Sequence, residues 1–180
     1  MKINKTKLDG VFLLENLFFQ DNRGNFTKVY NEDFFSKNEL CINIKEEFLS
    51  KSRRNVIRGM HFQLPPYDHE KLISVINGKV VDVILDLRTG SQTYGSYIEL
   101  LLNEDDYKSI YIPKGLAHGF KAMSDNTIMI YNVSTTHRME YDSGIRFDSF
   151  GYDWKIKNPI ISKKDKNLMS FKEFEDINPF

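Results

Sequence analysis

Three side chains that can carry a proton or hold a charge lie close together in this sequence: Arg58, His61 and Lys71. The first two belong to an apolar run of β-type residues, 56–63, and the third opens the next such run. Histidine is the natural proton carrier at neutral pH, because its ordinary pKa lies nearest to neutrality. Residues 63–68 contain two prolines and an aspartate, so we expect a hairpin that returns Lys71 to the side of His61.

A regular strand would point Arg58 and His61 to opposite faces, because they are three residues apart. A β-bulge at Gly59 would turn both side chains to the same side. A single histidine on a strand is more often a buried group satisfied by a backbone carbonyl. Nearby charged residues on apolar strands favour a functional site, since burying such charges is costly unless they are paired or used.

The four histidines raise the question of a metal site: His61, His69, His118 and His137. Small β-barrel metalloenzymes usually carry two histidines one residue apart on a strand, and that spacing is absent around His61. We place His69 in a turn where it need not face the interior. The residue types and spacing therefore give no support for a metal ligand set, and we expect no metal.

Three further polar residues are ambiguous when they are taken singly. Tyr131 shares a strand face with apolar residues, as a core tyrosine would. Asp165 follows a serine and two lysines, where it could cap or solvate the start of a helix. Arg23 lies in a turn-forming string.

Composition limits the possible partners and compartment. The 25 basic residues balance the 25 acidic residues, so nothing favours nucleic acid or an acidic membrane as partner. Cys41 is the only cysteine, which excludes a disulfide framework, and we expect it to be a small buried residue. The apolar stretch 11–19 is too short and too interrupted for a signal core or a membrane span, so we expect a cytoplasmic protein.

About ten short strands with turns between them predict a sandwich or barrel of jelly-roll type. Asn77 and Gly78 predict a two-residue hairpin. The strand over 79–87 has one apolar face and one face with Asp82 and Asp86, which suits a barrel wall with a polar lumen. We expect one all-β domain, residues 1–180, with a short helix over 34–40, one or two helices over 163–176, and strands over 11–19, 25–30, 42–49, 56–63, 71–76, 79–87, 95–102, 109–112, 117–122 and 127–133.

Seven strings occur in an order and at separations that closely resemble the dTDP-4-dehydrorhamnose 3,5-epimerase family over nearly the whole chain. The resemblance implies a cupin-type jelly-roll barrel with short peripheral helices, a homodimer that exchanges edge strands, and neither metal nor other cofactor. The strings are Asp21-Asn-Arg-Gly24, Arg58-Gly-Met-His-Phe-Gln63, Lys71, Gly78-Lys-Val-Val-Asp-Val-Ile-Leu-Asp-Leu-Arg88, Ser91-Gln-Thr-Tyr-Gly95, Ile112-Pro-Lys-Gly-Leu-Ala-His-Gly-Phe120 and Ser162-Lys-Lys-Asp165.

The resemblance also implies roles for the reacting residues. The family's substrate is a nucleotide-diphospho 4-keto-6-deoxy sugar, whose ketone acidifies the protons on C3 and C5. By resemblance, His61 takes the proton, and Asp165 orients the His61 ring. Lys71, with Arg58 nearby, would stabilise the enolate oxygen, and Tyr131 would return a proton from the opposite face.

Two further residues resemble family binding groups. His118 looks like a pocket residue near the sugar. Arg23 resembles the arginine that binds the diphosphate, reaching across the dimer. The expected partners are therefore a nucleotide-diphospho sugar and a second copy of the chain, with no nucleic acid and no membrane.

Several positions depart from the family pattern. Lys28 replaces a glutamate, Glu46 and Phe48 stand in a string that is otherwise Gln-Asp-Asn, His137 replaces a tyrosine, and Lys155 follows Trp154 where the family has proline. The first three of these positions surround the nucleotide in the family, so we count Lys28, Glu46, Phe48 and His137 as candidate substrate-binding residues.

These departures predict an epimerase with another nucleotide or sugar, for example a GDP-linked 4-keto heptose in capsule or lipopolysaccharide synthesis, inverting C3, C5 or both. A non-catalytic module that binds nucleotide sugars is the alternative, and a metal-dependent oxygenase is a third possibility.

Overall fold

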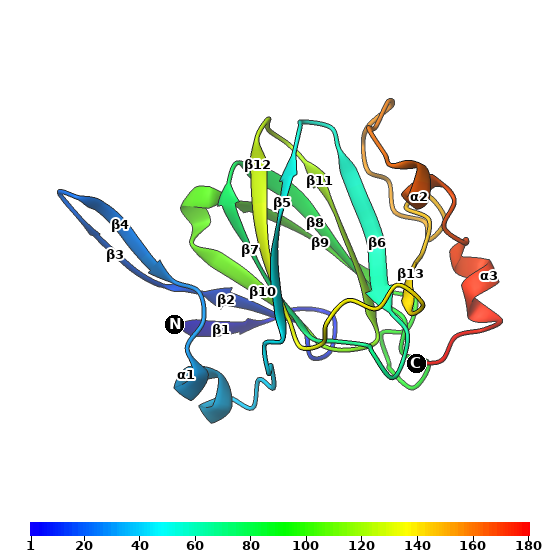
Figure 1. Cartoon of the computed structure of the whole chain (residues 1–180), viewed down its shortest axis with the longest axis horizontal. Coiled ribbons are helices and arrows are strands. Elements are labelled where there is room, and N and C mark those ends of the chain that lie inside the picture. Colours follow the sequence, from blue (N-terminus) through cyan, green and yellow to red (C-terminus); the bar gives the residue numbers. More distant parts are fainter.

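The computed structural model describes residues 1–180, which form two β-sheets and a separate hairpin (Figure 1). The larger sheet has the strand order β1-β2-β10-β7-β12-β5, and the smaller has the order β13-β6-β11-β8-β9. All strand pairs are antiparallel. The strands are β1 (Lys2–Lys5), β2 (Phe12–Glu15), β3 (Leu17–Asp21), β4 (Gly24–Lys28), β5 (Glu46–Ser52), β6 (Ile57–Gln63), β7 (Lys71–Asn77), β8 (Lys79–Asp86), β9 (Tyr97–Asn103), β10 (Lys108–Ile112), β11 (Leu116–Ala122), β12 (Thr127–Val133) and β13 (Asp142–Gly144).

The prediction of a mostly β protein is confirmed, but both sheets are open in this structure and no closed barrel is seen. Exchange of edge strands in a dimer stays a prediction. The expected strand over 11–19 is wrong, because the chain leaves the larger sheet at Asn16 and begins a hairpin. The Asn16 side chain donates a hydrogen bond to Ser109 Oγ at 2.8 Å, which fixes this exit. The short edge strands β1 and β13 were not predicted.

Both predicted hairpins around β7 are wrong. Residues 64–70 carry the chain from β6 in the smaller sheet to β7 in the larger one, and Asn77 with Gly78 carries it back to β8. Each of these strands already has a neighbour on both edges, so no edge is free for the sequence neighbour. The turn-forming residues therefore predict where the chain reverses direction, but they do not predict which strands pair.

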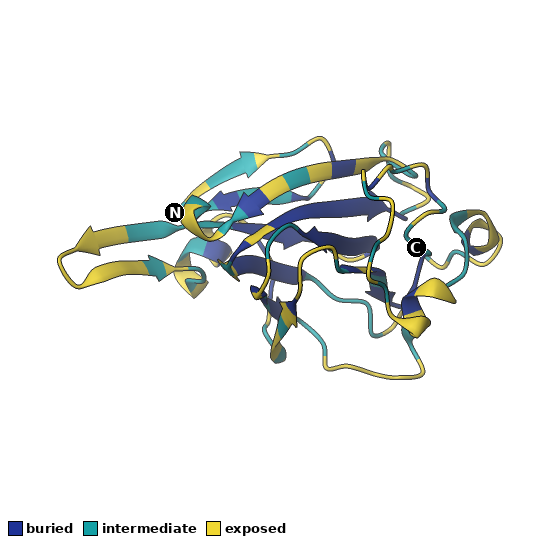
Figure 2. Cartoon of the chain, turned by 90° about the horizontal axis from the view of Figure 1, so that it is seen from above, coloured by how far each residue is buried: buried dark blue, intermediate teal, exposed yellow.

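The main core lies between the two sheets, and a second core lies on the outer face of the smaller sheet. Strand β8 contributes to both, since Val80 and Ile84 face the first core and Val83 and Leu85 face the second. The inner strands are therefore buried on both faces, whereas their outer neighbours are partly exposed (Figure 2). Apolar burial of this extent is the dominant stabilising term for such a fold.

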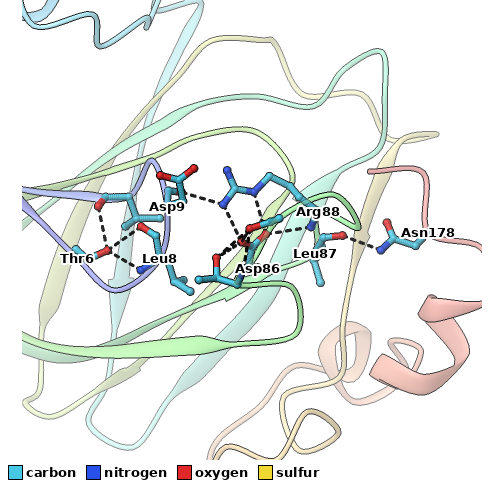
Figure 3. Close-up of polar contacts among 10 residues, drawn as sticks. Thr6, Leu8, Asp9, Asp86, Leu87, Arg88 and Asn178 are labelled. Atoms are coloured by element: carbon cyan, nitrogen blue, oxygen red, sulfur yellow. Dashed lines mark hydrogen bonds and ion pairs between the residues drawn. The ribbon is translucent and has the colours of Figure 1, made fainter.

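Asp86, on the strand face that was predicted to line a polar lumen, is buried in a hydrogen-bond network. Its buried carboxylate accepts hydrogen bonds from Arg88 at 2.9 and 2.7 Å, from Ser91 at 2.7 Å and from Thr93 at 2.6 Å. Burial acts to raise the pKa of Asp86, but these bonds outweigh it and lower the pKa. Arg88 also donates to the carbonyl of Asp9, so this network ties the loop after β8 to the N-terminal loop (Figure 3).

Three short α-helices complete the fold: α1 (Glu32–Lys37), α2 (Lys163–Lys166) and α3 (Phe171–Glu175). Asn31 caps α1 by accepting a hydrogen bond from the Phe34 amide. The prediction of one or two helices over 163–176 is confirmed: α2 and α3 both form there and lie beside β6 and β13 (Figure 1). No helix combines the length and the apolar character that crossing a bilayer requires.

The expectation that Cys41 is buried is wrong, because its side chain is exposed. Its neighbours Leu40 and Ile42 turn inward to a small core beside α1. The backbone of Cys41 contributes instead of its thiol: its carbonyl accepts a hydrogen bond from Tyr111 at 3.0 Å.

The hairpin formed by β3 and β4 projects away from both sheets, and its tip is exposed (Figures 1 and 2). Phe19 and Phe26 are cross-strand partners with their ring centroids 6.4 Å apart, and both are more than half exposed. Arg23 lies at the turn of this hairpin. The projecting arm therefore presents aromatic and charged side chains far from the cores.

The expected bulge in β6 is confirmed. Opposite β11, His61 pairs with His118 and Arg58 pairs with Phe120, so β6 carries one extra residue. Gly59 sits within this bulge at a φ of 117°, a conformation that strongly favours glycine. A Cβ there would lie 2.5 Å from Gly119 Cα and 2.7 Å from the His118 carbonyl oxygen.

We expect Gly59→Ala to destabilise the protein by roughly 2 kcal/mol more than Gly24→Ala, measured by urea unfolding. Both glycines have a large positive φ, 117° and 124°, but no heavy atom lies within 4 Å of a Cβ built on Gly24. The comparison therefore isolates the collision with β11. Equal losses for the two variants would contradict the close approach of these strands.

Candidate active site

One cavity of about 430 Å³ opens between the two sheets and collects most of the charged candidates. Arg58, His61 and His118 reach it from the smaller sheet, whereas Tyr131 and Lys71 reach it from the larger sheet. Groups that are opposed in this way can act on two faces of a single ligand. The full lining is Glu46, Phe48, Leu49, Ser50, Arg58, His61, Phe62, Gln63, His69, Lys71, His118, Phe120, Tyr131, Val133, Thr135, His137 and Asp142.

Asp165 lies behind His61 and holds it in place. The Nε2 atom of His61 is 2.9 Å from Asp165 Oδ1, and the Gly59 amide donates to Asp165 Oδ2 at 3.2 Å. Ser162 caps α2 by accepting from the Asp165 amide, which fixes the position of the carboxylate. Burial acts to raise the pKa of Asp165, but the hydrogen bond and charge of His61, with the Gly59 amide, lower it. An ionised Asp165 favours the Nε2–H tautomer, which leaves His61 Nδ1 free to accept a proton.

Lys71 is the buried cation of the cavity. Its Nζ donates a hydrogen bond to the His61 carbonyl oxygen at 2.8 Å, although the expected hairpin between them does not exist. Burial lowers the pKa of Lys71 to about 8, and the nearby carboxylates of Asp82 and Asp142 partly oppose this effect. Lys71 is thus mostly protonated at neutral pH and close to its titration range.

Tyr131 is buried in the opposite wall, where desolvation raises the pKa of its phenol. Ser50 approaches its hydroxyl at 3.5 Å, and the His118 ring meets the tyrosine ring edge-on with centroids 6.0 Å apart. Phe48 stacks on the tyrosine ring. A phenol in this setting stays protonated and can serve as a proton donor.

His118 forms a second histidine–carboxylate pair that the sequence reasoning did not assign. Its Nε2 lies 2.8 Å from Asp82 Oδ2, and both side chains are buried. The other carboxylate oxygen, Asp82 Oδ1, has no hydrogen-bond partner. The sequence did carry a signal for Asp82, because the alternation of residues along β8 predicts that this carboxylate lies on an inward face.

His69 lies between β6 and β7, outside any strand, and its side chain also lines the cavity, which the sequence had left open. Its Nδ1 lies 3.2 Å from both the Gln63 amide nitrogen and the Thr135 hydroxyl. Burial, followed by the charge of Lys71, lowers the pKa of His69 to about 3, so the ring is neutral. No sequence pattern pointed to this cluster, because its members come from three separate segments.

The rim of the cavity contains Glu46, His137 and Asp142. Glu46 accepts a hydrogen bond from the His137 amide at 2.8 Å, and Asp142 lies 3.3 Å from His137 Nε2. Asp142 also pairs with Lys164. Burial acts to raise the pKa of Asp142, but Lys164 and His137 lower it. Glu46 and His137, two of the predicted binding residues, therefore contact each other.

Two predicted binding residues lie outside this cavity. Arg23 is ion-paired with Asp21 at 2.6 Å on the projecting hairpin, and Lys28 ends the same hairpin at its base. Arg58 does reach the cavity, where Ser52 Oγ and the Lys51 carbonyl accept from its guanidinium at 3.1 and 3.2 Å. No group of three or more His, Cys, Asp or Glu side chains is arranged to hold a metal ion.

Paired acid–base groups on opposite walls of a polar cavity are typical of enzymes that move protons, and comparison with known proteins agrees. The sequence model of dTDP-4-dehydrorhamnose 3,5-epimerase matches residues 5–173. The epimerase of that name from Methanothermobacter thermautotrophicus is 39% identical over 174 residues, covering 94% of each chain.

Solved structures give the same result. The Bacillus anthracis dTDP-4-dehydrorhamnose 3,5-epimerase, crystallised with TDP and PPi, superposes with a TM-score of 0.91 at 34% identity, covering 94% of this chain and 99% of that one. The Legionella pneumophila dTDP-6-deoxy-D-glucose-3,5-epimerase, solved with dTDP-4-keto-L-rhamnose, gives 0.90 at 27% identity, covering 95% and 93%. The chain is thus an isomerase. It belongs to the dTDP-4-dehydrorhamnose 3,5-epimerase family.

We expect the pKa of Lys71 to appear in the pH dependence of stability. The folded chain releases this proton near pH 8 and the unfolded chain near pH 10.5, so the unfolded state binds more protons in between. The stability of the wild type relative to Lys71→Met should therefore rise by roughly 3 kcal/mol from pH 8 to 10.5. Urea unfolding at fixed pH values measures this difference.

The matched control is Lys79→Met, which removes an exposed lysine from β8. An exposed ammonium is hydrated in both states, so the control should not reproduce the rise. If the difference in the free energy of unfolding between wild type and Lys71→Met does not change from pH 8 to 10.5, Lys71 is not buried as described.

Proposed function

We propose that this protein inverts C3, C5 or both of a nucleotide-diphospho 4-keto sugar, with His61 and Tyr131 acting on opposite faces of the sugar ring. The supporting observation is that these two groups come from different sheets and line one cavity. Inversion of a carbon requires removal of a proton on one side and delivery on the other. A cavity with acid–base groups on a single wall would not favour that outcome.

The reaction that we propose begins with His61. Its Nδ1 takes the proton from the carbon next to the ketone, and the electron pair of that C–H bond moves onto the ketone oxygen, giving an enolate. Asp165 keeps the imidazole in the accepting tautomer and stabilises the imidazolium that forms. Tyr131 then protonates the carbon from the other face, and solvent restores both residues.

The enolate oxygen needs positive charge, and Lys71 and Arg58 are the cations that line the cavity. A fixed positive charge in a site shielded from water stabilises such an oxyanion by several kcal/mol. Lys71 is also close to its titration range, so it could donate a proton as well as a charge. We assign the two cations to this role.

We further propose dTDP as the first nucleotide to test, because the relatives at 39% and 34% identity carry that name. Glu46, Phe48 and His137 at the cavity rim differ from the family pattern, which supports testing GDP- and CDP-linked sugars, including a GDP-linked 4-keto heptose. Capsule or lipopolysaccharide synthesis is the setting that we propose for such products.

In heavy water the enzyme should incorporate deuterium at C3, C5 or both, without added metal or nicotinamide. We expect His61→Asn to reduce this exchange at least about 100-fold, because a general base contributes roughly that much. Tyr131→Phe should retain some exchange but return most of the label with unchanged configuration. Proton NMR of the sugar follows both outcomes.

Absence of exchange with dTDP-, GDP- and CDP-linked 4-keto sugars would overturn the epimerase proposal. Binding of one of them without exchange, unaffected by His61→Asn, would instead identify a non-catalytic nucleotide-sugar module.

We also propose that the active unit is a homodimer in which Arg23 of one copy serves the diphosphate site of the other. Two observations support this arrangement: the hairpin projects away from both sheets of its own chain, and its tip is exposed. Within one chain Arg23 has only Asp21 as its partner. The family resemblance assigns such an arginine to the diphosphate.

Mixed dimers test this arrangement. Arg23→Ala and His61→Asn should each be nearly inactive alone, whereas co-expression with different tags should yield a heterodimer with one intact site. That site combines His61 of one copy with Arg23 of the other, so about half of the wild-type activity should return. If a purified heterodimer recovers no activity, the proposed exchange is wrong: either Arg23 and His61 of the same chain form one site, or Arg23 does not belong to the site.

A further inference from the structure

Phe48 and Tyr131 form a face-to-face aromatic pair across two strands. They are direct partners in the register of β5 and β12, which puts their side chains on the same face of the sheet. Their ring centroids are 4.8 Å apart, and the planes differ by only 9°. Phe48 therefore stacks in parallel against one face of the tyrosine ring, with the two rings offset.

Hydrogen bonds alone do not fix the Tyr131 ring. Its closest polar neighbours are Ser50 Oγ at 3.5 Å and the Met129 sulfur at 3.6 Å, both too distant for strong hydrogen bonds. The edge of His118 meets the ring with centroids 6.0 Å apart, and the Asp82 carboxylate holds His118. The phenol is thus positioned mainly by ring packing, with Phe48 on its face and His118 at an angle to it.

Phe48 is also the more exposed member of the pair. Phe48 is 44% exposed, whereas Tyr131 is only 7% exposed. Strand β5 is the edge of the larger sheet, so no further strand shields Tyr131 on that side. Removal of the Phe48 ring would open this wall of the cavity to water.

We propose that Phe48 is a positioning residue that holds the Tyr131 phenol over the sugar face opposite His61 and keeps water away from it. The inference rests on the proposed function for the role of Tyr131 but not for the contact itself. A freely moving or hydrated Tyr131 would compete poorly with return of the proton by His61. Phe48 thereby determines how often an abstracted proton leads to inversion.

Two substitutions separate positioning from simple bulk. Phe48→Asn removes the ring, and Phe48→Tyr keeps a ring of the same shape. In heavy water, Phe48→Asn should lower the ratio of inverted product to labelled, uninverted substrate by roughly tenfold. This loss is smaller than the roughly 100-fold that a general acid contributes, because Tyr131 itself is still present. Phe48→Tyr should stay within about twofold of the wild-type ratio.

The control is Glu47→Asn, because this neighbour lies on the same strand with its side chain on the opposite face and exposed. It should leave the ratio unchanged. An unchanged ratio in Phe48→Asn, with exchange still occurring, would overturn the proposal.

A second measurement needs no substrate. Carbon-13 labelled tyrosine, assigned with Tyr131→Phe, reports whether the Tyr131 ring flips slowly or rapidly and at which pH it ionises. Phe48→Asn should speed the flipping and bring the ionisation to lower pH, because water reaches the phenol. Phe48→Tyr should resemble the wild type.

The two measurements fail in different ways. If the wild type exchanges no substrate, the proposed function fails, and the carbon-13 experiment still decides whether Phe48 orders Tyr131. Identical Tyr131 spectra in the wild type and Phe48→Asn would show that the stacked ring positions nothing.

Discussion

A single carboxylate makes the contact on which the site depends. Asp165 binds the ring of His61 with one oxygen and the amide of Gly59 with the other, so it fixes both the base and the bulge that turns the base inward. The bulge in turn needs glycine on both strands, since Gly59 and Gly119 approach too closely for any Cβ. A short capped helix near the C-terminus thereby sets the geometry of a strand in the middle of the chain.

The two-sheet architecture supplies the second requirement. One sheet presents His61 and His118, and the other presents Tyr131 and Lys71, so groups of different proton affinity face each other across a small cavity. Burial pushes their pKa values in opposite directions, lowering that of Lys71 and raising that of Tyr131. Such an environment keeps the phenol neutral and brings the amine close to titration.

Local sequence signals predicted much of this arrangement. Strand β12 begins and ends where alternation places it, and the conflict between Arg58 and His61 correctly predicted a bulge at Gly59. The errors have a common physical origin in tertiary pairing. Asn77 and Gly78 form a turn, but both neighbouring strands find partners elsewhere, so no hairpin results. His69 enters the cavity because distant loops enclose it, which no local pattern records.

Whether His61 is held as an accepting base can be measured without any substrate. Nitrogen-15 NMR of labelled histidine, assigned with His61→Asn, distinguishes the two ring tautomers through their one-bond and two-bond couplings. We predict that at neutral pH the neutral form of His61 carries its proton on Nε2, toward Asp165, with Nδ1 unprotonated. A ring that carries its proton on Nδ1, or that does not change tautomer in Asp165→Ala, would show that Asp165 does not hold His61 as an accepting base.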